Sequence, residues 1–170
     1  MTRHIVSILT LIAAATLFAT PPSAPAHAAG SCYGTGKRIT INTHLERLRA
    51  WDGCTVVLVT LVTTGNAELP TPLGHFEIYA KYSPYTFISP WSRSSPYWYP
   101  PSRVSFAMEF LRGYFIHDAP WRSVFGPGSN SGTQPGTNYG GTHGCVNVPY
   151  WAERFLYYWA PIGTPVHIMR

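Results

Sequence analysis

The chain has 170 residues, of which 45% are hydrophobic, 15% aromatic and 11% charged. This size and apolar content suffice for one domain with a buried core, and the sequence contains no internal repeat. The formal net charge is +5, but the lysines and arginines are scattered and form no dense run, which argues against binding to nucleic acid.

The first segment differs from the rest of the chain. Arg3 is followed by an uncharged apolar run, residues 5–19, and then by prolines and the triplet Ala26-His27-Ala28. This order is typical of a cleaved secretory signal peptide. We therefore expect residues 1–28 to be removed and residues 29–170 to form a single secreted domain. A membrane anchor is the alternative, but the run is shorter than the about 20 residues of a spanning helix, so no stable membrane span is expected.

Secretion would place the three cysteines in an oxidising compartment. Cys32 and Cys54 can then form a disulfide, which leaves Cys145 as the odd thiol. The two pairings that use Cys145 stay open from the sequence alone.

Alternating apolar and polar residues predict strands in the first half of the chain. One begins near Ile39, and a second covers residues 47–51, before the strong hairpin turn Asp52-Gly53. The β-branched run 55–64 predicts a central strand, so that these three form a β-meander. A further strand is predicted for 75–81.

Residues 82–101 are rich in prolines and aromatic side chains. They are too rich in proline for a central strand. A long ordered loop of this kind can form a lid or a cleft wall, although its aromatic rings can equally pack the loop onto a sheet.

The second half is predicted to contain a strand at 104–110 and another at 113–117, followed by a mobile glycine-rich segment at 126–141. A helix at 149–159 and a closing strand at 164–169 complete the chain. Pro149 suits the first helical turn, and Trp151, Phe155 and Tyr158 are predicted to share one side of the helix. The expected fold class is therefore mainly β with one or two short helices.

The chemistry of the chain centres on the stretch Thr142-His143-Gly144-Cys145-Val146-Asn147. A lone cysteine beside one histidine, with His117 upstream, is a candidate for nucleophilic acyl transfer. The thiolate is the reactive form, so Cys145 needs a neighbouring group that takes its proton. Gly144 permits a tight turn that can direct backbone N–H groups at an oxyanion.

This stretch resembles the Ser/Thr-His-Gly-Cys-x-Asn/Arg signature of the L,D-transpeptidase catalytic domain. Residues 115–121, Phe-Ile-His-Asp-Ala-Pro-Trp, resemble the strand that carries the catalytic histidine of that family. Residues 71–76, Thr-Pro-Leu-Gly-His-Phe, resemble its Thr-Pro-x-Gly-x-Phe turn. The three motifs occur in the family order between about Arg38 and the C-terminus. The resemblance implies a β-sandwich or mixed-sheet domain in which the cysteine and histidine loops meet.

The resemblance also implies a reaction on peptidoglycan stem peptides. Cys145 would attack the carbonyl of the third stem residue, expel the terminal D-alanine and form a thioester, which the side-chain amine of another stem then attacks. His117 would act as the base. His143 is a second catalytic candidate, and a buried His143 that holds the turn by hydrogen bonds is the alternative. The resemblance implies no cofactor or metal, and the expected protein is a monomer at the cell wall.

Further roles carried over from the family concern the turn and the substrate contacts. The turn and oxyanion candidates are Thr142 and Gly144, and the substrate-contact candidates are Trp121, Asn147, Tyr99 and Met108. Trp121 is equally interpretable as a core aromatic.

Two features depart from the family pattern. Asp118 stands where glycine or serine is usual. Its carboxylate either orients the imidazole of His117 or raises the pKa of that ring, and the alternative is that it faces solvent. The 24 residues 118–141 between His117 and Thr142 form a longer segment than usual, which predicts a longer flap over the cleft.

Rival interpretations stay open. His117, His143 and Cys145 could bind zinc, since cysteine and histidine are its usual ligands. A papain-like peptidase would place its cysteine before its histidine, opposite to the order here. Two further alternatives are a non-catalytic wall-binding module and an L,D-carboxypeptidase, which uses water as the acceptor.

Overall fold

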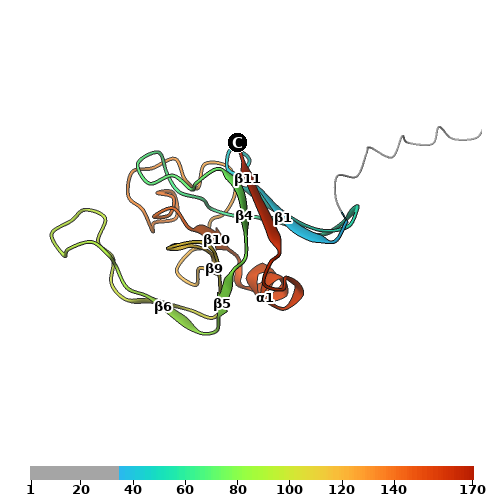
Figure 1. Ribbon diagram of the computed structural model, residues 1–170. Coiled ribbons are helices and arrows are strands. Elements are labelled where there is room, and N and C mark those ends of the chain that lie inside the picture. The colour runs from blue at the N-terminus through green and yellow to red at the C-terminus, as the bar shows by residue number, and fades with distance from the viewer. Residues whose placement is uncertain (1–34) are drawn as a thin grey trace, which may run out of the picture. The chain divides into compact units, whose positions relative to one another are not determined.

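The structure is a computed structural model, and it describes residues 35–170 (Figure 1). The predicted signal peptide, residues 1–28, lies outside the described residues, and so does Cys32. Three expectations therefore stay predictions: that the signal is removed, that residues 29–170 form a single domain, and that Cys32 pairs with Cys54. Within residues 35–170, no helix is long and apolar enough to cross a membrane.

The described part of the chain contains strands and one helix: β1 (Lys37–Asn42), β2 (Arg47–Asp52), β3 (Thr55–Leu61), β4 (Gly74–Glu77), β5 (Ala80–Tyr82), β6 (Tyr85–Phe87), β7 (Ser102–Val104), β8 (Ala107–Leu111), β9 (Tyr114–Asp118), β10 (Val146–Val148), α1 (Tyr150–Trp159) and β11 (Pro165–Met169).

These strands form two main sheets and a short ribbon. The five-stranded sheet has the order β3-β2-β1-β11-β4, in which only β1 and β11 are parallel. The four-stranded sheet has the order β10-β9-β8-β5, and β6 pairs with β7 in the ribbon. β9 and β10 lie on one side of β4, β11 and β1 (Figure 1). This mainly β architecture with one short helix confirms the predicted fold class.

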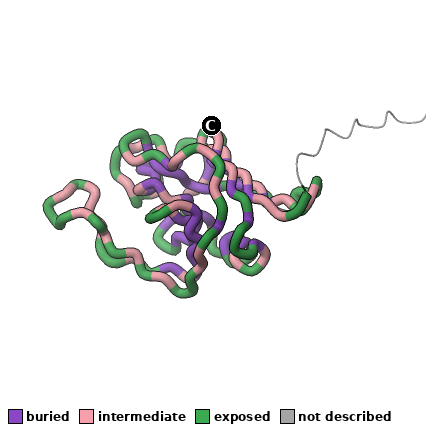
Figure 2. The backbone as a smooth tube through the Cα atoms, in the orientation of Figure 1, coloured by how far each residue is buried: buried purple, intermediate pink, exposed green. Residues whose placement is uncertain are grey.

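Strand alternation determines which side chains enter the core. Ile39 and Ile41 of β1 are fully buried, whereas the intervening Thr40 is half-buried on the other face. The buried side chains that the five-stranded sheet contributes are Ile39, Ile41, Leu48, Ala50, Val166 and Ile168. They pack against Leu156 of α1 and Ile116 of β9, and each such aliphatic side chain contributes about 1.5–3 kcal/mol on burial. Figure 2 shows the buried positions concentrated between the sheets.

The predicted meander is present, but the prediction of a central third strand is wrong. β3 lies at the edge of its sheet, and Val59 and Leu61 are 51% and 42% exposed. β3 is an edge strand because the C-terminal strand β11 pairs with the free side of β1, so that further strands are added on the side of the sheet opposite to β3. A β-branched run predicts a strand and does not determine its position in the sheet.

The single strand predicted for 75–81 is divided between the two sheets. β4 pairs with β11, and β5 pairs with β8. The crossing is made by Ile78, whose N–H donates to Thr164, and by Tyr79, whose N–H donates to the carbonyl of Glu109. The apolar alternation continues through this crossing, which explains why one strand was expected.

The helix begins directly after Pro149, as predicted, but its aromatic side faces solvent. Trp151 and Tyr158 are 59% and 70% exposed, whereas Ala152 and Leu156 are buried. Ala152, Leu156 and the fully buried Glu153 form the face that packs against β8 and β9. The core therefore uses the side of the helix opposite to the predicted aromatic set.

Candidate active site

The parallel pair β9 and β10 brings the predicted site residues together. The register pairs Asn147 with His117, and Cys145 directly precedes β10, beside Phe115. Side chains two positions apart on a strand share one face of the sheet. His117, Cys145 and Asn147 therefore project on the same side, although 28 positions separate the histidine from the cysteine in the sequence.

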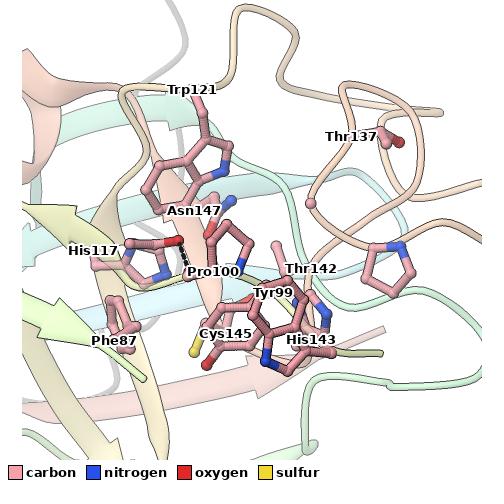
Figure 3. A pocket seen from close by; sticks show the side chains of 14 residues that line it. Phe87, Tyr99, Pro100, His117, Trp121, Thr137, Thr142, His143, Cys145 and Asn147 are labelled. Carbon is pink, nitrogen blue, oxygen red and sulfur yellow. Dashed lines mark hydrogen bonds between the residues drawn. The ribbon is translucent and has the colours of Figure 1, made fainter. Parts of the chain in front are cut away.

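These three side chains open into a cavity of about 430 Å³. Figure 3 shows that it is bordered by β9 and β10, by the segment 83–101, called the aromatic segment below, and by the glycine-rich segment 126–141. The lining residues are Phe87, Trp98, Tyr99, Pro100, Ser102, His117, Trp121, Pro135, Gly136, Thr137, Thr142, His143, Cys145 and Asn147. The wall contains no lysine, arginine, aspartate or glutamate, so histidine is its only basic residue type.

The buried side chain of His117 has a defined proton arrangement. Its Nδ1 lies 2.8 Å from the main-chain oxygen of Asp118. A carbonyl oxygen only accepts hydrogen bonds, so Nδ1 carries the proton and Nε2 keeps a free lone pair. Burial lowers the pKa of His117 to about 4. The imidazole is therefore neutral near pH 7 and able to accept a proton.

Cys145 is a free thiol that packs against Phe115. Its Sγ lies 3.9 Å from the carbonyl oxygen of Gly113, within reach of a weak S–H hydrogen bond. Burial raises the pKa of the Cys145 thiol to about 12. The resting pair is thus a neutral thiol with a neutral imidazole, and a thiolate requires a base in the site.

Two threonines hold the turn that presents Cys145. The hydroxyl of Thr142 donates to the Cys145 carbonyl at 2.6 Å and accepts from the N–H of Gly144 at 3.0 Å. The hydroxyl of Thr71 donates to the Gly144 carbonyl at 2.9 Å and accepts from the N–H of Gly65. Thr71 belongs to the Thr-Pro-x-Gly motif, but sequence reasoning assigned it no role.

This arrangement corrects one expectation. The N–H of Gly144 is already bonded to Thr142, so it is not available for an oxyanion, and the N–H of Cys145 is a candidate in its place. Gly144 is required for steric reasons instead. Its φ is +107°, and an added Cβ would lie 2.6 Å from a ring carbon of Tyr114.

His143 belongs to the aromatic wall of the cavity. Its ring centroid lies 4.7 Å from that of Tyr99 and 5.3 Å from that of Trp91. Burial lowers the pKa of His143, and a backbone hydrogen bond with Tyr97 opposes this shift. The hydrogen bonds that were expected of His143 in the turn are made by Thr142 and Thr71.

The remaining predicted substrate contacts divide into two groups. Trp121, Tyr99 and Asn147 line the cavity, and Trp121 is 42% exposed rather than a core aromatic. Met108 does not line the cavity. It is fully buried in the core, because its position on β8 faces the hydrophobic cluster, so the expectation that it contacts substrate is wrong.

Asp118 agrees with one of the expectations, because its negative charge raises the pKa of His117 against the larger lowering by burial. Its carboxylate is 1% exposed and accepts the N–H groups of Ser105, at 2.9 Å, and Phe106, at 2.7 Å. It therefore does not face solvent, and its oxygens are bonded to the chain after β7. The group of Asp118 that orients His117 is the main-chain carbonyl.

The segment 126–141, predicted to be mobile, is tied to the body of the domain. The guanidinium of Arg122 donates to the carbonyls of Asn138 and Gly141, both at 2.9 Å. The amide of Asn66 donates to the carbonyl of Gly140 at 3.1 Å. These bonds close the segment over the cavity, where Gly136 and its neighbours form part of the wall.

Glu46 is a further anchor that the sequence does not indicate. It is fully buried, and its carboxylate accepts from the N–H of Thr64 at 2.6 Å, from the Thr64 hydroxyl and from the amide of Asn130 at 2.6 Å. The carbonyl of Thr64 accepts the N–H of Thr142 at 3.0 Å, so Glu46 is connected to the turn that presents Cys145. Burial raises the pKa of Glu46 to about 7.

The zinc interpretation gains no geometric support. Among residues 35–170, no group of three or more histidine, cysteine, aspartate or glutamate side chains is arranged to hold a metal ion.

Comparison with known proteins identifies the family. The L,D-transpeptidase catalytic domain matches residues 36–168, so the chain belongs to this family. A search of curated proteins gave no match. The site described above therefore lies in an L,D-transpeptidase catalytic domain.

Solved structures of similar fold include three L,D-transpeptidases. The crystal structure of a cysteine-to-serine mutant from Enterococcus faecium has a TM-score of 0.63 and 23% identity, and the match covers 79% of this chain and 50% of that chain. The catalytic domain of the Enterococcus faecium enzyme has a TM-score of 0.64 and 23% identity, with 81% and 99% covered.

The third is L,D-transpeptidase 3 from Mycobacterium tuberculosis in complex with a faropenem-derived adduct. It has a TM-score of 0.59 and 18% identity, and the match covers 81% of this chain and 61% of that chain. At these identities the similarity shows the fold. The chain spans about half the length of the Enterococcus faecium mutant protein.

Proposed function

We propose that this protein is an L,D-transpeptidase that acts on peptidoglycan stem tetrapeptides through a thioester on Cys145. The observation that supports this proposal is the placement of Cys145 and His117 on one face of β9 and β10, at the same cavity. Membership of the family supplies the substrate class.

In the first half of the reaction, the Sγ of Cys145 attacks the carbonyl carbon of the third stem residue. The thiol proton passes to Nε2 of His117, which is neutral and unprotonated at rest. The N–H of Cys145 can donate to the oxyanion that forms. Collapse of this intermediate breaks the peptide bond, and His117 returns the proton to the amine of the departing D-alanine.

In the second half, the side-chain amine of another stem attacks the thioester carbonyl. His117 accepts a proton from this amine and then protonates the departing thiol of Cys145, so that the starting state is restored. Water in place of the amine would give an L,D-carboxypeptidase. The walls around the pair are aromatic and carry no acidic side chain, which suits a dry site where the oxyanion is stabilised strongly.

Export of the protein to the cell wall, a disulfide between Cys32 and Cys54 and a monomeric state belong to the same proposal. The disulfide would keep Cys145 as the reduced thiol. Thiol titration of the denatured, unreduced protein should find one free thiol, and a peptide map should link Cys32 to Cys54. Cys145 in the linked peptide would refute this scheme.

The decisive experiment combines a stem tetrapeptide donor with a stem acceptor and follows protein and products by mass spectrometry. We expect release of D-alanine, a protein adduct on Cys145 and a cross-linked dimer. Faropenem, a derivative of which is bound in the Mycobacterium tuberculosis structure, should also add mass to Cys145.

Cys145→Ala and Cys145→Ser should fold normally and lose both the adduct and the turnover. Ser94→Ala, an exposed change, is the matched control. Substantial cross-linking by the alanine variant would remove the cysteine from the reaction. Release of D-alanine without cross-linking would assign the carboxypeptidase activity.

A further inference from the structure

The imidazole of His117, the proposed base, is covered by aromatic rings as well as bonded at one edge. Its Nδ1 is bonded to the main-chain oxygen of Asp118, and the side chain is 4% exposed. The ring of Phe87, from β6, lies 4.6 Å from the imidazole between centroids, whereas that of Trp121 lies 6.0 Å away. Figure 3 shows these two rings on opposite sides of His117. Phe87 is therefore the nearer of the two covers.

Phe87 is itself held in this place by other rings. Its ring lies 5.1 Å from that of Phe115 and 4.8 Å from that of Tyr85, edge to face in both pairs, which is a favourable arrangement of aromatic rings. Phe115 is buried and precedes His117 by two positions on β9. The strand that carries the proposed base therefore also holds the ring that covers it.

Coverage of this kind has two consequences for a base. It excludes water from the face of the imidazole, which disfavours the charged imidazolium. It also opposes rotation of the ring, so that Nε2 stays on the edge opposite to the carbonyl of Asp118. Cys145 packs against the same aromatic cluster as Phe87. The ring thus borders the place where the thiol proton would be transferred.

An aromatic ring beside an imidazole can also act in the opposite sense, because the face of the ring attracts a cation. This attraction would raise the pKa of His117, whereas the exclusion of water lowers it. The pKa of His117 is lowered from 6.5 to about 4, with burial as the largest cause. The surroundings as a whole therefore act as a cover, and the sign of a pKa change on removal of one ring separates the two effects.

Charged and titratable groups also act on His117. The negative charge of Asp118 raises the pKa of His117, and the charge of Arg122 lowers it. The thiol of Cys145 is neutral at rest, and the residues that pair with His117 on β8 and β10 carry no charge. A substitution of Phe87 leaves all of these groups in the chain, so a change in the pKa of His117 reports the loss of the ring.

We propose that Phe87 is a positioning residue for the acyl transfer, whose ring shields the base from water and holds Nε2 of His117 toward the cavity. This inference rests on the proposed function, which makes His117 the base. It gives the ribbon of β6 and β7 a part in the reaction, although Phe87 itself exchanges no proton.

The test measures the pKa of His117 by NMR titration of histidine-labelled protein, with the signal assigned by its loss in His117→Gln. In Phe87→Ala this pKa should rise from about 4 to about 5, because water reaches the imidazole. The acid limb of faropenem acylation should move to higher pH with it, and acylation at neutral pH should be about tenfold slower. Phe87→Leu keeps an apolar side chain and should restore most of both, and it serves as the test variant if the alanine variant does not fold.

Two further variants are the controls. Ile88→Ala shortens an apolar side chain of the same segment that is 67% exposed, and it should leave the pKa of His117 and the acylation profile unchanged. Trp121→Ala removes the more distant ring, which is 42% exposed, and should raise the pKa of His117 by less than Phe87→Ala does.

An unchanged pKa of His117 in both Phe87 variants would overturn the proposal, whatever their rates of acylation. A lowered pKa would overturn it as well, because the ring would then stabilise the imidazolium. A raised pKa in Phe87→Ala, together with no acylation even in the original protein, would count against the proposed function and leave the shielding of His117 intact.

Discussion

The two segments that border the cavity are held by different forces. The aromatic segment, 83–101, projects away from the sheets (Figure 1). Beyond the pairing of β6 with β7 at its base, it is organised by ring contacts. Trp91 lies 6.0 Å from Tyr97 and 5.3 Å from His143 between ring centroids. A side-chain hydrogen bond joins the aromatic segment to the body of the domain, from the Tyr97 hydroxyl to the Glu68 carboxylate at 3.1 Å, and this bond is exposed.

The glycine-rich segment, 126–141, is bonded to buried polar groups. Glu46 is fully buried and Arg122 is 6% exposed, and both make hydrogen bonds to this segment. Composition alone suggests that the glycine-rich segment is the looser of the two. The contacts indicate the reverse, because a buried charged partner that loses its bonds is costly, whereas half-buried ring contacts are individually weak.

Both segments enclose Cys145 and His117, so removal of the proposed base gives the largest expected effect. His117→Ala should slow acylation of Cys145 by about 10²–10⁴ while leaving both segments in place. The original protein should lose activity as the pH falls toward about 4, where His117 becomes protonated, and should be nearly independent of pH at neutral values.

The variant should behave differently with pH. Its thiol must lose the proton unaided, so its rate should rise by about tenfold per pH unit toward the thiol pKa of about 12. Stopped-flow measurement of faropenem acylation gives both profiles. An unchanged rate in His117→Ala at every pH would transfer the role of base to His143.

The anchor of the glycine-rich segment should give the next largest effect. The pKa of Glu46 is raised from 4.5 to about 7, so the folded chain holds this proton more tightly than the unfolded chain. The resulting stability is complete below pH 4.5 and is lost as the pH rises through about 7. In Glu46→Gln this dependence is absent, so the difference in unfolding free energy between the two proteins should change by about 3 kcal/mol across that window.

Chemical denaturation at the two ends of the window measures this difference. Glu68→Gln, in an exposed carboxylate that contacts the aromatic segment, is the control and should show a pH profile parallel to that of the original protein. A parallel profile for Glu46→Gln as well would contradict the assigned role of Glu46.

The chain that follows the aromatic segment, directly after β7, has a buried polar anchor in Asp118. Asp118→Ala leaves the N–H groups of Ser105 and Phe106 without their acceptor and should cost about 1–3 kcal/mol in unfolding free energy. Asp118→Asn keeps one oxygen and should cost less. Because the carboxylate favours protonated His117, the asparagine variant should also lower the pKa of His117 and shift the acid limb of acylation to lower pH. Equal stability of the alanine variant and the original protein would contradict the anchor.

The smallest effect is expected within the aromatic segment itself. Tyr97→Phe removes the exposed hydrogen bond to Glu68 and keeps the ring, so the unfolding free energy should not change measurably. Thermal denaturation compares this variant with Asp118→Ala. A loss as large as that of Asp118→Ala would show that this exposed bond holds the aromatic segment as firmly as a buried anchor does, and would remove the contrast with the glycine-rich segment.

Local patterns in the sequence predict the elements that depend on local interactions. The meander, the helix after Pro149 and the cysteine motif are all encoded in contiguous residues, and the family follows from three such motifs. The position of His117 beside the cysteine turn was expected from the family. The structure explains it by the parallel pairing of β9 with β10.

Features that depend on tertiary pairing could not be predicted in this way. The carboxylate of Asp118 accepts the N–H groups of Ser105 and Phe106, because the residues after β7 lie beside the end of β9. No local pattern in the sequence predicts this contact. Glu46 is a charged residue in a short turn, with a φ of +44°, and the sequence suggests an exposed position for it. Met108 alternates correctly for a strand, but alternation does not distinguish a core face from a cavity face.

Gly144 also limits which sequences this turn can tolerate. If residues 142–147 were randomised and active variants selected, position 144 should remain glycine in nearly every survivor. A smaller residue in place of Tyr114 would remove the clash at 2.6 Å, but it would leave the φ of +107°, which other residues rarely adopt. The shape of the cavity around Cys145 therefore has to be changed by substituting other lining residues, such as Trp121 and Tyr99. A directed-evolution library for a new acyl donor should begin with these positions.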